Sequence, residues 1–144
     1  MARRQSLNSL KRKALRFEGL EEVTENLGRV IDSVVGAEAK RVYVEAAAIG
    51  RDTVREMAPQ GKTGNLKKGV FAAAGDENQP NALLGMNYKI APHAHLVEYG
   101  HGGGSPAPPH PYFRPGIIAA GSRMGARIRE GLARVLENAA ARKA

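Results

Sequence analysis

Four histidines and one glutamate form the part of this sequence where metal chemistry is conceivable. His93 and His95 stand two residues apart, and His101 and His110 follow. On a strand, alternate side chains share a face, so both imidazoles of the first pair could reach one zinc ion. No Asp is nearby, and on a strand Glu98 would face away from His95. We therefore favour histidines gathered by chance over a metal-dependent hydrolase that uses His93, His95 and His101.

Two further patterns suggest enzyme chemistry but lack its structural context. Gly61–Gly64 (GKTG) offers the glycines and lysine of a phosphate loop, yet the usual spacing is absent and a helix precedes it. Ser105, His101 and Glu98 could form a hydrolase triad, but a serine in a glycine-proline loop lacks a rigid elbow and an evident oxyanion hole. We expect no enzyme, no catalytic residue, no metal ligand and no cofactor.

The chain is strongly basic, with a net charge of +8 and a sequence pI near 10.1. Six basic residues lie within residues 1–16, which we expect to form a flexible arm because this segment has no acid and few large apolar groups. They are Arg3, Arg4, Lys11, Arg12, Lys13 and Arg16. DNA phosphates or an acidic protein surface could bind this arm, and we favour the protein surface because no recognition motif or aromatic side chain accompanies the basic residues.

Length and composition predict one soluble domain beyond this arm, over residues 17–144. The 144 residues contain no Cys, which excludes disulfides, thiolate catalysis and Cys-ligated zinc. No apolar run has the length of a signal peptide or a membrane span, so we expect synthesis in a cytoplasm and no membrane contact. Few aromatic residues and many small aliphatic ones are typical of a subunit that completes its packing in an assembly.

Three stretches have the periodicity of helices. Apolar residues recur every three or four positions from Phe17 to Val34, with acids near the start, and again from Ala39 to Met57. Pro59 should end the second helix at about Met57. A third apolar face from Ile117 to Ala139 predicts a helix that starts after Arg114-Pro115.

The middle of the chain predicts a small sheet. Leu66–Phe71 indicates a short extended segment, and Leu83–Ile90 and His95–Tyr99 are expected to form an antiparallel pair. Gly100–Pro111 is too rich in glycine and proline for either regular structure, and long irregular loops often carry contacts. The expected fold class is α+β, a small antiparallel sheet packed with two N-terminal helices and one C-terminal helix.

Several short motifs follow one another along the chain. Ala58-Pro59 is followed by Lys62–Leu66 (KTGNL), then by His95–Gly100 (HLVEYG) and Pro111–Pro115 (PYFRP). In type and order they resemble the A-P-x-x-T-G-N-L, V-E-[FY]-G-T and P-F-[LF]-R-P-A segments of the phage HK-97-type neck protein family. The resemblance begins at the helix start Phe17–Glu22 and runs to about Asn138. The chain departs from the pattern at His101, Tyr112 and Gly116, and the basic arm is extra.

The resemblance implies a structural virion protein of a tailed, siphophage-like bacteriophage at the head-tail interface. Such a tail completion protein forms a homo-oligomeric ring, a hexamer or dodecamer, around the channel for the genomic DNA, and is assembled in the bacterial host cytoplasm. Its partners would be head connector, adaptor or stopper proteins and tail terminator or tail tube proteins. The alternatives are a basic nucleic-acid-binding protein and a tail terminator ring that caps the tail tube.

We expect the subunit or ring contacts in the two loop regions and around the Phe113-Arg114 pair. The residues are Lys62, Thr63, Asn65, Glu98, Tyr99, His101, Tyr112, Phe113 and Arg114. Arg114 beside Phe113 offers a planar donor next to an apolar anchor, which suits an interface. The alternative for Arg114 is a buried role within the subunit, in which it caps the sheet through Glu98.

Overall fold

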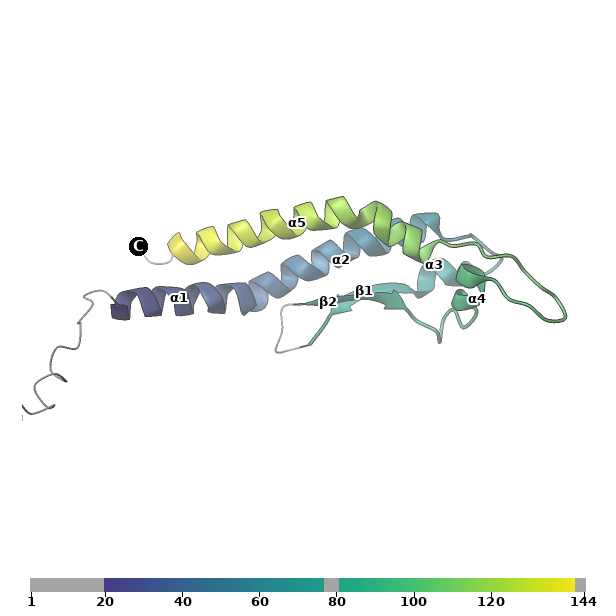
Figure 1. Cartoon of the computed structure of the whole chain (residues 1–144), viewed down its shortest axis with the longest axis horizontal. Helices are drawn as coiled ribbons and strands as arrows, with labels where there is room; N and C mark the ends of the chain where they lie inside the picture. The colour runs from purple at the N-terminus through teal and green to yellow at the C-terminus, as the bar shows by residue number, and fades with distance from the viewer. Residues whose placement is uncertain (1–19, 77–80, 142–144) are drawn as a thin grey trace, which may run out of the picture.

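The chain forms an elongated molecule of helices with a two-stranded antiparallel sheet, which confirms the α+β class (Figure 1). The computed structural model describes residues 20–76 and 81–141. The predicted basic arm, residues 1–16, and Phe17 lie outside the described residues. The elements, in chain order, are α1 (Leu20–Val35), α2 (Ala37–Met57), α3 (Asn65–Gly69), β1 (Val70–Ala74), β2 (Ala82–Met86), α4 (Ala94–Tyr99) and α5 (Phe113–Ala141).

Helices α2 and α5 run side by side in opposite directions and form the frame of the molecule (Figure 1). Glycines on α5 let the two helices approach closely. Gly116 packs on Val54, where a Cβ atom would stand 2.7 Å from Val54 Cγ2, and Gly131 packs on Val42 in the same way. A larger residue at either position would push the two helices apart.

The sheet lies against α2 and is short. Its register runs from Val70 opposite Met86 to Ala74 opposite Ala82. A buried hydrophobic cluster gathers where β1, α2, α3 and α4 meet the residue just before α5. It consists of Val54, Ala58, Leu66, Val70, Ala91, Ala94 and Tyr112. The core therefore supports the end of the molecule at which the loops lie.

Two predictions for the middle of the chain are wrong. His95–Tyr99 is helical rather than extended, because Ala94, Val97 and Glu98 face inward with helical spacing despite the strand preference of Val and Tyr. The strand expected over Leu83–Ile90 covers Ala82–Met86 and pairs with Val70–Ala74 instead. The described part of the sheet consequently has two strands.

Two predicted boundaries also change. Leu66 lies in the short helix α3, so the extended segment begins only at Val70. Helix α5 begins at Phe113, two residues before Pro115. A proline is tolerated in the first turn because the N–H it lacks has no partner within the helix. The end of α2 at Met57 is confirmed, and Ala58 before Pro59 has the extended backbone that proline demands.

Candidate interaction site

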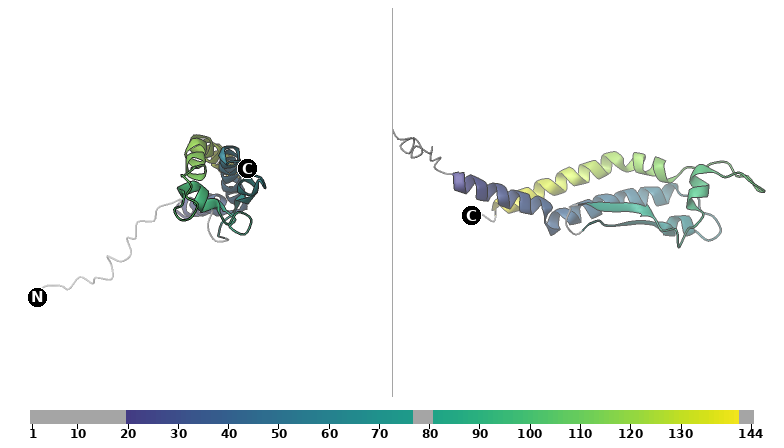
Figure 2. Two further views of the ribbon diagram at one scale, coloured as in Figure 1. Left: turned by 90° about the vertical axis from the view of Figure 1, so that its right-hand side faces the viewer. Right: turned by 60° about the horizontal axis from the view of Figure 1, so that its bottom comes forward.

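The two loops singled out in the sequence lie at the same end of the molecule. Figure 1 and the right-hand view of Figure 2 place the turn between α2 and α3 and the loop between α4 and α5 beyond the frame helices. In the turn, Gly61 and Gly64 have positive φ angles of 43° and 64°. Lys62 and Thr63 are exposed there, while Asn65 is half-buried. The turn therefore presents one cation and one hydroxyl to solvent.

The loop after α4 is a small projecting hairpin. His101 and Ala107 exchange two backbone hydrogen bonds of 3.1 and 3.0 Å, and the His110 amide donates to the Val97 carbonyl at 2.8 Å. Gly100 leaves α4 with a φ of +73°, and a Cβ there would stand 2.8 Å from the Ala107 carbonyl oxygen. Residues 101–111 are all exposed, so this hairpin offers its whole surface for contact.

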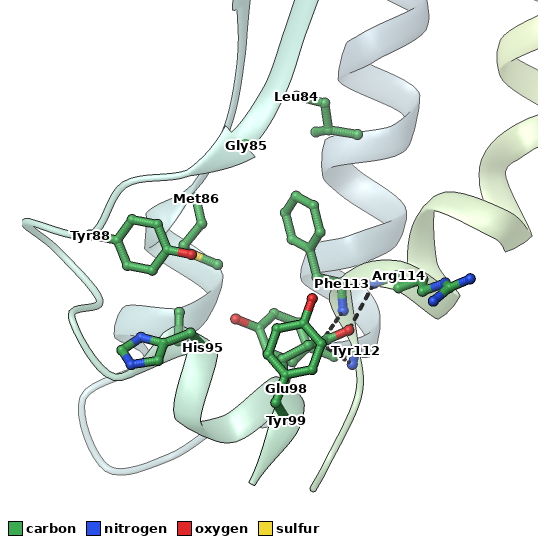
Figure 3. A pocket seen from close by; sticks show the side chains of 11 residues that line it. Leu84, Gly85, Met86, Tyr88, His95, Glu98, Tyr99, Tyr112, Phe113 and Arg114 are labelled. Carbon is green, nitrogen blue, oxygen red and sulfur yellow. Dashed lines mark hydrogen bonds between the residues drawn. The ribbon is translucent and has the colours of Figure 1, made fainter. Parts of the chain in front are cut away.

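Glu98 joins α4 to the start of α5. One carboxylate oxygen, Oε2, accepts hydrogen bonds from the backbone N–H groups of Tyr112 at 2.8 Å and Phe113 at 2.9 Å, and Oε1 accepts one from Arg114 at 3.1 Å (Figure 3). The first N–H groups of a helix have no partners inside it, and the positive end of the helix dipole favours an anion. A buried carboxylate thus caps α5 from a distant part of the sequence.

This arrangement shifts two ionisation equilibria. Burial raises the pKa of Glu98, but the hydrogen bonds from Tyr112, Phe113 and Arg114 outweigh it and bring the pKa below its ordinary value. Glu98 is therefore ionised at neutral pH. Burial, together with the negative charge of Glu98 and a smaller effect of Tyr88, raises the pKa of Tyr112 to about 12.

A cavity of about 200 Å³ opens beside this cap (Figure 3). Aromatic side chains dominate its lining, and the rings of Tyr88 and His95 meet edge to face with centroids 6.0 Å apart. Tyr99 stands at the cavity with 77% of its surface exposed. Because the Glu98 carboxylate is already engaged by three amides, the cavity suits an apolar or aromatic anchor from a partner.

The predicted contact residues divide by exposure. The exposed residues are Lys62, Thr63, Tyr99, His101 and Arg114. Asn65 and Phe113 are half-buried, whereas Glu98 and Tyr112 are buried and hold the frame of the site. Arg114 is tied to Glu98 through its backbone N–H rather than its guanidinium, so the alternative role proposed for its side chain is wrong.

Tyr88 and His95 line the cavity, but the sequence analysis did not include them among the expected contact residues. His95 and Glu98 line the same cavity because they are three residues apart on a helix, whereas a strand would have separated them. The spacing of Val97 and Glu98, three and four residues after Ala94, was the available signal for a helix. A helical reading of that segment would have placed both side chains together.

The sequence raised a metal site and a hydrolase triad as alternatives that would use the histidines. Across residues 20–76 and 81–141, no three His, Asp or Glu side chains gather closely enough to hold a metal ion. The Glu98 carboxylate points at the α5 amides, and the Nδ1 atom of His101 lies 3.4 Å from the Gly102 carbonyl.

None of the helices in the described part of the chain is both long and apolar enough to cross a bilayer.

Comparisons with known proteins add no relative. No protein-family model matches the chain, and neither the curated proteins nor the solved structures contain a significant match to it.

Proposed function

We propose that this chain is a structural virion protein of a tailed bacteriophage, which forms a homo-oligomeric ring at the head-tail joint. The resemblance of its ordered segments to the HK-97-type neck protein family supports this proposal. Function in this account is mechanical, because the ring keeps the path of the DNA continuous between connector and tail. No catalytic residue is required for that role.

The observation that carries the proposal is the gathering of the resembling segments at one end of the molecule. The turn at Gly61–Asn65, the hairpin at Gly100–Pro111 and the start of α5 lie together there (Figure 1). These segments come from distant parts of the sequence, and the Glu98 cap and the buried cluster fix them relative to one another. Long exposed loops on a rigid support are typical of contact surfaces.

The surface of this end has the composition of a protein interface. It combines the exposed ring of Tyr99, the exposed guanidinium of Arg114 and an aromatic cavity open to solvent. Tyr and Arg are enriched among the residues that dominate binding energy in interfaces. A neighbouring subunit or ring that inserts an apolar side chain into the cavity would cover all three features.

The experiment mixes gold-labelled chain with tail tubes and with DNA-filled heads and locates the label by electron microscopy. We expect label at the head-tail joint for the native chain and for Leu83→Ala, which changes an exposed residue on β2. Tyr99→Ala, which changes a residue too exposed to affect folding, should lose most of the label. Label spread along free DNA, with none on particles, would replace the proposal with the nucleic-acid-binding alternative.

A further inference from the structure

The hairpin after α4 contains a run of residues whose backbone is set by proline. In residues 105–111 (SPAPPHP), every position is a proline or directly precedes one. A proline holds its own φ at about −65° and pushes the residue before it into extended or polyproline II geometry. All peptide bonds of this run are trans, and residues 106–111 contain no helix or turn. We call residues 105–111 the proline segment.

A few contacts hold the proline segment in place without covering it. Ala107 is bound to His101 by the two backbone hydrogen bonds of the hairpin. The ring of Pro109 lies against Gly100, where a Cβ atom would stand 3.0 Å from Pro109 Cδ. Every residue of the segment is nevertheless exposed. An exposed segment of preset geometry loses little conformational entropy when it binds a partner.

Two prolines form the free side of this segment. Pro108 and Pro111 are three residues apart, which is about one turn of a polyproline II helix, so their rings share a side that Pro109 does not occupy. Within the described residues, no backbone N–H group donates to the carbonyl of Pro108 or Pro111. This side therefore offers two rings and free acceptor oxygens. Proline-rich segments of this kind bind grooves lined by aromatic side chains.

The chain itself has an open aromatic cavity at the same end of the molecule (Figures 1 and 3). Tyr88 and Tyr99 in its lining are 57% and 77% exposed, and His95 between them is exposed as well. Tyrosine hydroxyls can donate to the carbonyls of a polyproline II segment, which makes no internal hydrogen bonds. Residues 100–111 are all described, and none of them lines the cavity. The proline segment of the same chain therefore does not fill it.

Charge favours the proline segment over the basic arm as the occupant of this cavity. The carboxylate in the lining, Glu98, already accepts hydrogen bonds from three backbone N–H groups, and Arg114 in the same lining is a cation. The basic residues within residues 1–16 would find no free anion there. The proline segment contains no Lys, Arg, Asp or Glu, so it can enter without burying a formal charge.

We propose that the proline segment of one copy binds in the aromatic cavity of a second copy of this chain, with Pro108 and Pro111 against the rings of Tyr88 and Tyr99. This inference rests on the self-association contained in the proposed function and names the surfaces that perform it. The two surfaces differ, so the contact repeats head to tail and forms a ring when the rotation closes. Salt should change the assembly little, because the contact contains no exposed ion pair.

The first test measures assembly of the full chain by light scattering over a range of concentrations. Pro108→Ala/Pro111→Ala removes the two rings and frees the backbone, and Tyr99→Ala removes an exposed ring of the cavity. Each variant should raise the half-assembly concentration about tenfold. The three changes together should raise it little further, because both sides belong to one contact. A combined rise of about 100-fold would show two independent effects and overturn the inference.

A matched control changes the same hairpin away from its prolines. Gly102→Ala/Gly104→Ala adds two methyl groups at positions where a Cβ atom meets nothing within 4 Å. This control should assemble like the native chain, and circular dichroism should show the same helix content in all variants. Unchanged assembly of Pro108→Ala/Pro111→Ala would overturn the inference.

The second test uses cross-linking, which is clean because the chain has no Cys. Ala107→Cys places a thiol beside Pro108, and Lys89→Cys places one beside Tyr88, at positions that are both exposed. A short bismaleimide should join chains with both changes into a ladder of dimers, trimers and larger products. A cross-linked monomer as the only product would show that the segment reaches its own cavity, and efficient dimers of Ala107→Cys alone would show paired hairpins. Either result would overturn the inference.

The outcomes separate this inference from the proposed function. Rings and label at the head-tail joint that survive in Pro108→Ala/Pro111→Ala would overturn the docking and leave the virion role standing. Loss of label in that variant with unchanged assembly would assign the proline segment to another protein's groove and also overturn the docking. A native chain that stays monomeric at every concentration would overturn both proposals. A ladder in the double-cysteine variant without label on particles would support the docking and contradict the virion role.

Discussion

The cap that Glu98 places on α5 leads to a quantitative prediction. Glu98→Gln keeps the size of the side chain but removes its charge and replaces one acceptor oxygen with an NH2 group. Three amides at 2.8, 2.9 and 3.1 Å depend on the two carboxylate oxygens, so at least one N–H group then faces another donor. Hydrogen bonds to a charged group contribute about 1.5–3 kcal/mol each. One lost bond and two weakened ones should lower the free energy of unfolding by about 3 kcal/mol.

The pH dependence gives this prediction its assay. Because the pKa of Glu98 in the folded chain lies below the ordinary value of 4.5, its contribution is present above pH 4.5 and disappears as the pH falls through the folded-state pKa. Urea unfolding, followed by circular dichroism at one chain concentration, would be measured near neutral pH and stepwise below pH 4.5. The native chain should lose the advantage over Glu98→Gln in that acid range. Equal stability of the two chains at neutral pH would refute the reasoning.

Two further predictions concern the packing of α5 and the buried tyrosine. Gly116→Ala should lower the free energy of unfolding by about 1–2 kcal/mol, because the new methyl group meets Val54 and this overpacking exceeds the helix preference of alanine. Gly121→Ala, where nothing lies within 4 Å, should raise it by up to about 1 kcal/mol, and an equal gain at both positions in urea unfolding would contradict the packing. Tyr112, with a pKa raised from 10.0 to about 12, favours the fold below pH 10.0, and that contribution is lost between pH 10.0 and about 12. An ultraviolet titration in which all four tyrosines ionise together near pH 10 without unfolding would contradict that shift.

The long helices were predictable from sequence because their signals are local. Proline at position 59 ends α2 at Met57, and the three-and-four spacing of apolar residues marks α1 and α5. The spacing of the apolar residues did not show which of them neighbouring elements would bury. On α5, Ile118 and Leu136 are exposed, while Gly116 and Gly131 lie at the packed face. A glycine contributes no hydrophobic signal, although it permits the closest contact between helices.

The candidate site was less predictable because it depends on contacts between distant segments. Val97 and Tyr99 favour a strand, but α4 becomes a helix when Ala94 packs into the core and Glu98 reaches the amides of Tyr112 and beyond. A cap usually comes from the residue that directly precedes a helix, so no local pattern indicated one from 14 residues away. The sequence did identify the loop after Gly100 as irregular, because glycine and proline determine that locally.

The measurement that tests the central claim most directly is the native mass of the purified full chain, combined with electron microscopy of the same sample. The account predicts a single closed oligomer, of hexamer or dodecamer mass, with a central channel. A chain that remains a monomer at all concentrations, and binds free DNA with an affinity that falls steeply with salt, would contradict it.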